Sequence, residues 1–253
     1  MKPPVSALLD TCAYRLTDTV EAAVVEHTVQ WGPTELTLPI VGSRRKPPLS
    51  PNERWKQDQI EAMPTIARLA RENLLGLFVY PELGLEIFRG GAHAGFGVGN
   101  LIKDVQIGKL PAALERSKFQ GMDFQDYAQK DRLIEFVSLL LSLDHCAVKA
   151  LSKSRLKFTD FELQNLRSLD RFREICANLP EKHYPDAFHL WTAEVNGLDF
   201  FLTADRKFIR ALTESSRLGL TTRPIAARSL LNEMGITELD PMPVAHYNFN
   251  YLF

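Results

Sequence analysis

The stretch that decides the fold runs from Pro185 to Phe208 and reads PDAFHLWTAEVNGLDFFLTADRKF. Its opening proline suits the first turn of a helix, Gly197 suits the end of that helix, and apolar residues recur between them at helical spacing. The run Leu198–Leu202 is apolar but for one aspartate, which predicts a short strand buried on both faces. Asp205 follows just past the carboxyl end of this strand. In open α/β sheets, ligands bind at that edge.

Two other segments place acids in the same way. Val5–Leu9 is apolar apart from one serine, which predicts a strand, and Asp10 follows it. Leu77–Tyr80 predicts another strand, which leads into the segment PELGLEIF. That segment can turn helical from its proline, and it then carries Glu82 and Glu86 four residues apart on one face.

Acids from these separate segments are predicted to converge, because the carboxyl ends of parallel strands share one edge of a sheet. The predicted set is Asp10, Glu86, Asp186 and Asp205, with Glu82 as the alternative to Glu86. Packed like charges repel and raise each other's pKa, so the cluster needs a divalent cation to neutralise it. Ligands that offer only oxygen atoms indicate Mg²⁺ or Mn²⁺.

In these segments the chain resembles the PIN-domain ribonucleases. The resemblance lies in SALLDTCAY around Asp10, in VYPELGLEIF around Glu86, and in the stretch quoted first, around Asp186 and Asp205. The order of the motifs is that of the family: an acid after a strand, a glutamate on a helix, Asp-Ala before a helix, and a strand followed by Thr-x-Asp. Where the family usually has asparagine two residues after its first aspartate, this chain has Cys12.

The resemblance implies both a fold and an activity. The implied fold is a three-layer α/β/α sandwich around a parallel sheet, forming a single domain over residues 1–253 with insertions at about 18–50 and 90–130. The implied activity is that of a metal-dependent endoribonuclease whose products carry a 5′-phosphate and a 3′-hydroxyl. The residues implied to hold Mg²⁺ or Mn²⁺ and to carry the catalysis are Asp10, Glu86, Asp186 and Asp205.

The segments between these motifs predict an inserted hairpin and extra helices. Apolar and polar residues alternate on both sides of Gly32, which predicts a two-stranded hairpin, and Pro39 argues for an edge strand. A proline-rich loop is expected over Gly42–Pro51 and a mobile glycine-rich loop over Gly90–Gly99. Helices are predicted over Asn52–Asn73 (kinked or split at Pro64), Asp131–Lys153, Thr159–Ala177 (capped by Thr159 and Glu162), the residues after Asp205 and Ser229–Gly235. A last short strand is predicted over Arg223–Ile225. An aromatic tail over Leu239–Phe253 is predicted to pack across the surface or to pair with an edge.

The amino-acid composition excludes some classes of protein. Hydrophobic residues make up 45% of the 253 residues, enough for a packed core and too many for a disordered chain. The formal net charge is −1, so contact with RNA has to come from local basic groups. Two basic clusters, Arg44–Lys46 and Lys149–Lys157, are either solvated faces or guides for a phosphate backbone. Three cysteines without a paired motif and the lack of a secretory signal or a membrane span predict a cytoplasmic protein.

Other interpretations stay open at this point. His183, Asp186 and His189 are residue types that can bind zinc, but a spacing of three and three residues holds them poorly on one face of a helix. His189 is therefore expected at the helix surface or core edge. Thr203 either orients a carboxylate or water or caps the next helix. The chain is predicted to act on single-stranded RNA. The alternatives are a silent PIN-like interaction module with a protein partner, a homodimer paired through the hairpin edge, or the toxin of a toxin–antitoxin pair.

Overall fold

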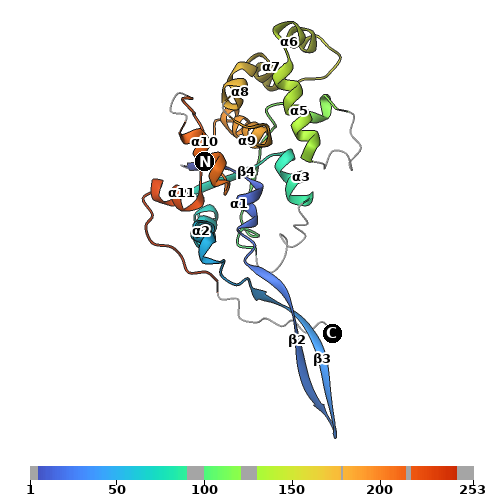
Figure 1. Cartoon of the computed structure of the whole chain (residues 1–253), viewed down its shortest axis with the longest axis vertical. Helices are drawn as coiled ribbons and strands as arrows, with labels where there is room; N and C mark the ends of the chain where they lie inside the picture. The colour runs from blue at the N-terminus through green and yellow to red at the C-terminus, as the bar shows by residue number, and fades with distance from the viewer. Residues whose placement is uncertain (1–4, 90–99, 121–129, 178, 215–217, 244–253) are drawn as a thin grey trace.

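The chain forms a mixed α/β structure built on a parallel sheet (Figure 1). The computed structural model describes residues 5–89, 100–120, 130–177, 179–214 and 218–243. Within these ranges the sheet has five strands in the order β5-β4-β1-β6-β7, and each adjacent pair is parallel. The strands are β1 (Val5–Leu9), β4 (Leu75–Val79), β5 (Gly108–Lys109), β6 (Phe200–Leu202) and β7 (Arg223–Ile225).

Helices cover both faces of this sheet, which confirms the predicted three-layer α/β/α sandwich. Successive residues of β1 point to opposite faces, so Leu8 packs into one core while Ala7 and Leu9 pack into the other. The core around Leu8 is closed mainly by α5, α8, α9 and α10, and the other core by α1, α2 and α11. The helix bounds are α1 (Thr11–Arg15), α2 (Arg54–Arg71), α3 (Pro81–Arg89), α5 (Lys130–Ser142), α6 (His145–Ser152), α7 (Asp160–Arg167), α8 (Leu169–Cys176), α9 (Tyr184–Val195), α10 (Arg206–Thr213) and α11 (Ala227–Glu233).

Two predicted helices are each divided in the structure. The one expected over Asp131–Lys153 breaks after α5, because Asp144 begins a new helix by accepting a hydrogen bond from the backbone N–H of Ala147. The one expected over Thr159–Ala177 has the predicted capping box but breaks at Ser168, which ends α7 and starts α8. The Ser168 hydroxyl donates to the carbonyl of Gln164 at 3.0 Å, a local bond that competes with helix continuation.

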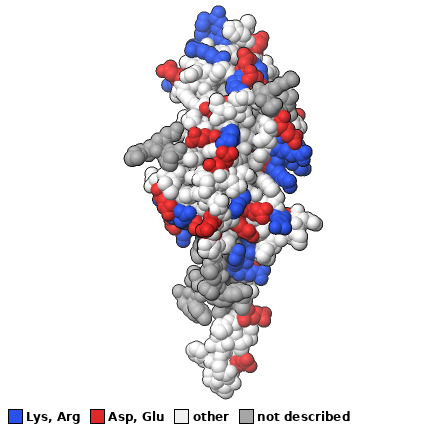
Figure 2. All heavy atoms as spheres, turned by 90° about the vertical axis from the view of Figure 1, so that its left-hand side faces the viewer, with Lys and Arg blue, Asp and Glu red and all other residues white. Residues whose placement is uncertain are grey.

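The predicted hairpin is longer than expected. β2 (Val20–Trp31) pairs antiparallel with β3 (Thr34–Arg45) along its whole length, so the expected loop begins only at Lys46. The hairpin forms a separate sheet that extends away from the body (Figure 1). Trp31 is 74% exposed and Leu38 48% exposed, and on the face of the hairpin that Figure 2 turns to the viewer few charged residues are seen.

The remaining expectations concern shorter segments. α2 runs without interruption through Pro64, which is buried, so the helix is not split there. The last strand and the short helix after Asp205 are confirmed as β7 and α10, and α11 covers most of the final helical segment. The glycine-rich stretch 90–99 and the tail from residue 244 lie outside the described residues. In the part of the chain that is described, no helix is both long and apolar enough to cross a membrane.

The capping box of α7 provides a test of stability against pH. The buried Glu162 carboxylate accepts bonds from the Thr159 backbone at 2.8 Å and hydroxyl at 2.9 Å, and from the Lys118 ammonium. Burial alone would raise the pKa of Glu162, but these bonds outweigh it and hold the pKa below its usual value. A depressed folded-state pKa stabilises the protein above the unfolded-state pKa, and this stabilisation is lost as the pH falls towards the folded-state value.

We therefore expect Glu162→Gln to lower the free energy of unfolding by about 2 kcal/mol at pH 7 and by much less at pH 3. Urea unfolding at both pH values measures the difference. Glu238→Gln is the matched control, because Glu238 is exposed and its replacement should change the free energy of unfolding little. An equal loss for Glu162→Gln at both pH values would contradict the assignment.

Candidate metal centre

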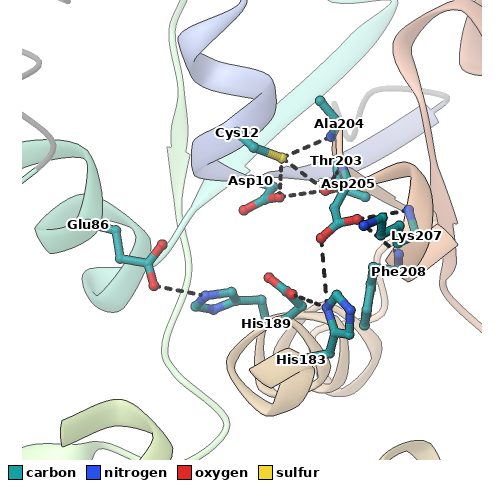
Figure 3. A network of polar contacts seen from close by, with 11 residues as sticks. Asp10, Cys12, Glu86, His183, His189, Thr203, Ala204, Asp205, Lys207 and Phe208 are labelled. Carbon is teal, nitrogen blue, oxygen red and sulfur yellow. Dashed lines mark hydrogen bonds and ion pairs between the residues drawn. The ribbon is translucent and has the colours of Figure 1, made fainter. Parts of the chain in front are cut away.

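All four predicted acids line one cavity of about 500 Å³. Asp10 follows β1, Glu86 lies on α3 after β4, Asp205 follows β6, and Asp186 lies in the first turn of α9. The cavity thus lies at the carboxyl edge of the sheet, where the sequence placed it. Figure 3 shows the side chains of Asp10, Glu86 and Asp205 directed to this region from three different segments.

Asp10 is held in place by two side chains. It is 5% exposed, and its Oδ2 accepts bonds from the Cys12 thiol at 2.7 Å and the Thr203 hydroxyl at 2.5 Å. Burial raises the pKa of Asp10, and the nearby charge of His189 opposes that rise. Thr203 therefore orients a carboxylate, which was one of its two predicted roles, while the cap of α10 is Asp205. Cys12 is thus a second side-chain donor to Asp10, beside Thr203.

Asp205 divides its two carboxylate oxygens between two tasks. Oδ1 caps α10 by accepting from the backbone N–H groups of Lys207 at 2.9 Å and Phe208 at 3.0 Å. Oδ2 lies 3.7 Å from Nδ1 of His183, which in turn lies 3.1 Å from Oδ2 of Asp186 (Figure 3). One ligand atom of each of these three residues lies within 4.8 Å of the others, so His183, Asp186 and Asp205 could hold a metal ion.

The electrostatics of Asp186 point the same way. Burial, followed by the charge of Asp10, raises the pKa of Asp186 to about 6. Neighbouring carboxylates thus disfavour each other's charged forms, and a divalent cation would relieve this repulsion. The set His183, Asp186 and Asp205 offers two carboxylates and one imidazole, which could hold a metal ion without fixing which one.

Glu86 is half-buried and has its own set of partners in the cavity. Its Oε2 accepts from the Thr11 hydroxyl at 2.9 Å, and its Oε1 lies 3.2 Å from Nε2 of His189. The other ring nitrogen of His189 lies 2.5 Å from the hydroxyl of Tyr80. Burial by itself would lower the pKa of His189, but the charge and hydrogen bond of Glu86, helped by two aspartates, raise it to about 9. His189 therefore brings a buried positive charge to the acidic cavity.

This position of His189 corrects the sequence interpretation. His189 is 1% exposed and lies inside the core, not at the helix surface or core edge. It contacts Glu86, whereas His183 contacts Asp186, so the two histidines do not share a zinc site. The sequence reasoning missed His183 as a partner of both aspartates, although its spacing of three from Asp186 was visible.

The choice between Glu82 and Glu86 is also decided by geometry. Glu82 is 3% exposed and accepts from Arg116 at 2.8 and 3.1 Å, which keeps its carboxylate in a buried ion pair. Glu82 does not line the cavity, whereas Glu86 does. Four residues apart on α3, the two glutamates therefore have different surroundings, and only Glu86 is placed with the other acids.

Cations line the same cavity, and sequence reasoning missed them. Arg15, Lys182 and Lys207 are exposed, and none forms an ion pair with the described residues. The two basic clusters of the sequence, read there as either solvated faces or guides for a phosphate backbone, do not line this cavity. Arg44 pairs with Glu21 and Lys46 with Asp18 on the hairpin, and Lys149 belongs to α6. A single basic residue near an acid motif is a weaker sequence signal than a cluster of basic residues.

Comparisons of the chain with family models, with curated proteins and with solved structures found no match. The cavity and its side chains are therefore the basis for inferring a function.

Proposed function

We propose that the protein is a metal-dependent endoribonuclease of the PIN type that hydrolyses phosphodiester bonds in single-stranded RNA. One observation carries the proposal: four acids and three cations line the same cavity at the carboxyl edge of the sheet. The acids suit a hard divalent cation, either Mg²⁺ or Mn²⁺, and the cations suit the phosphates of a polyanion. Because the chain as a whole has a net charge of −1, this local arrangement explains where RNA would bind.

Each side chain has a distinct task in this proposal. His183, Asp186 and Asp205 would hold the cation, with Asp10 as a further ligand from the same cavity, and Cys12 and Thr203 orient the Asp10 carboxylate. A divalent cation bound there would stabilise charge on the phosphoryl group and make a nearby water more acidic. Lys182, Lys207 and Arg15 hold the RNA backbone at the mouth of the cavity. Glu86 is positioned by Thr11 and His189 to hold the attacking water or a second cation.

The same site supports a proposal for the compartment. We place the protein in the cytoplasm, since Cys12 has to stay a free thiol in order to donate to Asp10. Burial and the charge of Asp10 raise the pKa of the Cys12 thiol well above its usual value, so the sulfur keeps its proton.

The hairpin favours a second candidate function, that of a PIN-like interaction module. Its exposed apolar residues, Trp31, Leu36 and Leu38 among them, offer a surface to a protein partner or to a second copy of the chain. Calorimetry separates the two functions, because a nuclease site should bind Mn²⁺ and this binding should weaken when one of its acids is replaced. No uptake of Mn²⁺ by the wild-type protein would favour the interaction module.

The direct test is cleavage of single-stranded RNA with Mg²⁺, with Mn²⁺ and with EDTA. We expect cleavage only with a divalent cation, and a loss of more than about a hundredfold in Asp10→Asn and Asp205→Asn, because even residues behind the ligands of a metal site cost 10–100-fold when removed. Asp104→Asn, an exposed aspartate away from the cavity, is the matched control. Equal cleavage by the wild type and both site variants would identify a contaminating nuclease and contradict the proposal.

A further inference from the structure

A second cavity, of about 610 Å³, lies beside the acidic one at the β7 edge of the sheet. Its lining comes from α10, β7 and α11, with Trp55 from the start of α2. The buried residues Leu212, Pro224 and Ile225 give it an apolar lining. The guanidinium of Arg206 lies 5.8 Å from the ring centre of Trp55, within the range of a cation–π contact.

The first turn of α10 separates the two cavities. Asp205 and Lys207 line the acidic cavity, whereas Arg206 between them lines the cavity of Trp55. Consecutive Cα atoms are about 3.8 Å apart, so the two cavities meet at this turn. A single strand of nucleic acid that crosses the turn can therefore reach both cavities with neighbouring nucleotides.

The chemistry of the second cavity suits a nucleobase with its phosphate. An aromatic ring beside an apolar lining binds any base by stacking, and arginines beside it bind the backbone. Arg206 forms no ion pair with the described residues, while Arg210 pairs with Glu214 and Arg223 with Glu233 in exposed contacts. The cation of Arg206 is therefore available to a phosphate.

The geometry of β7 argues against an added peptide strand as the occupant. Arg223 and Ile225 make their backbone hydrogen bonds to the β6 side. The backbone groups of the residue between them therefore point away from β6, to the side where a further strand would be added. That residue is Pro224, which has no N–H to donate to a new strand. The free side of β7 thus lacks a backbone N–H donor at the position where an added peptide strand would need one.

We infer that the Trp55 cavity binds a base of the RNA next to the phosphate held in the acidic cavity, with the base stacked on Trp55 and its phosphate paired with Arg206. The inference deepens the proposed function and rests on it for the position of the cut. It makes the protein a reader of unpaired RNA, because a base inside a duplex cannot stack on a side chain.

Tryptophan fluorescence tests this inference. Of the three tryptophans, Trp191 is fully buried and Trp31 lies on the hairpin, so a Trp31→Phe background leaves Trp55 as the responsive group. Titration with a short oligouridylate in EDTA, where nothing is cut, should quench the fluorescence. Trp55→Leu and Arg206→Ala should each weaken binding about tenfold, the effect of losing one stacked base or its clamp. Trp55→Phe should retain most of the affinity.

Matched controls separate this result from general effects. Trp31→Leu removes an exposed tryptophan on the hairpin, and Arg167→Ala removes an exposed arginine on α7; neither should change binding. Unchanged affinity in Trp55→Leu and Arg206→Ala, in protein that cuts RNA normally, would overturn the inference and leave the proposed function standing. Quenching by RNA in a protein that cuts nothing with Mn²⁺ would support the base site and contradict the nuclease. Absence of any RNA binding would overturn the inference.

Discussion

Asp186→Asn is expected to lose more than about a hundredfold of the RNA cleavage and, in the same protein without metal, to unfold at a higher temperature. The loss of activity follows from removing a charged ligand. The gain in stability follows from burial and from the charge of Asp10, which raise the pKa of Asp186 to about 6 and so make its ionised form unfavourable in the folded protein. We expect the unfolding temperature in EDTA at pH 7.5 to rise by about 5 °C, since 1 kcal/mol corresponds to roughly 2–4 °C in a chain of this size.

The direction of this change in unfolding temperature can be checked by varying the pH. The usual pKa of aspartate is 3.8, below the folded-state value of about 6, so the cost of ionising Asp186 is absent in strong acid and complete above pH 6. The difference in unfolding temperature between the variant and the wild type should therefore grow from pH 4 to pH 7. Mn²⁺ should raise the unfolding temperature of the wild type more than that of the variant. A variant less stable than the wild type in EDTA at pH 7.5 would refute this account.

Arg116→Met is expected to cause the largest loss of stability. Arg116 is 2% exposed and holds Glu82, 3% exposed, with a bond of 2.8 Å, so its removal leaves a buried carboxylate without its cation. Breaking such a pair typically costs about 3–5 kcal/mol. Urea unfolding at pH 7 measures the loss. Since Glu82 and Glu86 share α3, we also expect weaker binding of Mn²⁺.

The double variant Glu82→Leu/Arg116→Met provides the decisive comparison. Replacing both partners of a buried pair with apolar residues is often neutral, so this variant should regain most of the lost stability. Arg210→Met is the surface control, because the pair of Arg210 with Glu214 is exposed and should matter by less than about 1 kcal/mol. A double variant as unstable as Arg116→Met alone would show that the pair is not the cause.

The layers of the fold could be predicted because the signals are local. Each strand of the central sheet near the site is a short apolar run, and an acid follows β1 directly, so the topology alone brings Asp10 and Asp205 to one edge. The capping box of α7 is equally local, since Thr159 and Glu162 are three residues apart. The acids of the site were visible for the same reason.

What could not be predicted depends on partners far away in the chain. The role of Glu82 is set by Arg116, 34 residues later, and the burial of His189 is set by Tyr80 and Glu86, more than 100 residues earlier. Helical spacing describes one face of one helix and contains no information on such partners. The missed cations, such as Lys182, stand alone in the sequence, and only the fold shows that they surround one cavity.

The two ends of the sheet have a consequence for how copies of this chain can associate. β5 at one end has only two residues, and β7 at the other has three with a proline in the middle. Among the described residues, neither border of the central sheet offers a ladder long enough to recruit a strand from a neighbour, whereas β2 and β3, twelve residues each, are both open edges of their own sheet. Pairing between copies through strand edges is therefore expected at the β2–β3 hairpin and not at the central sheet.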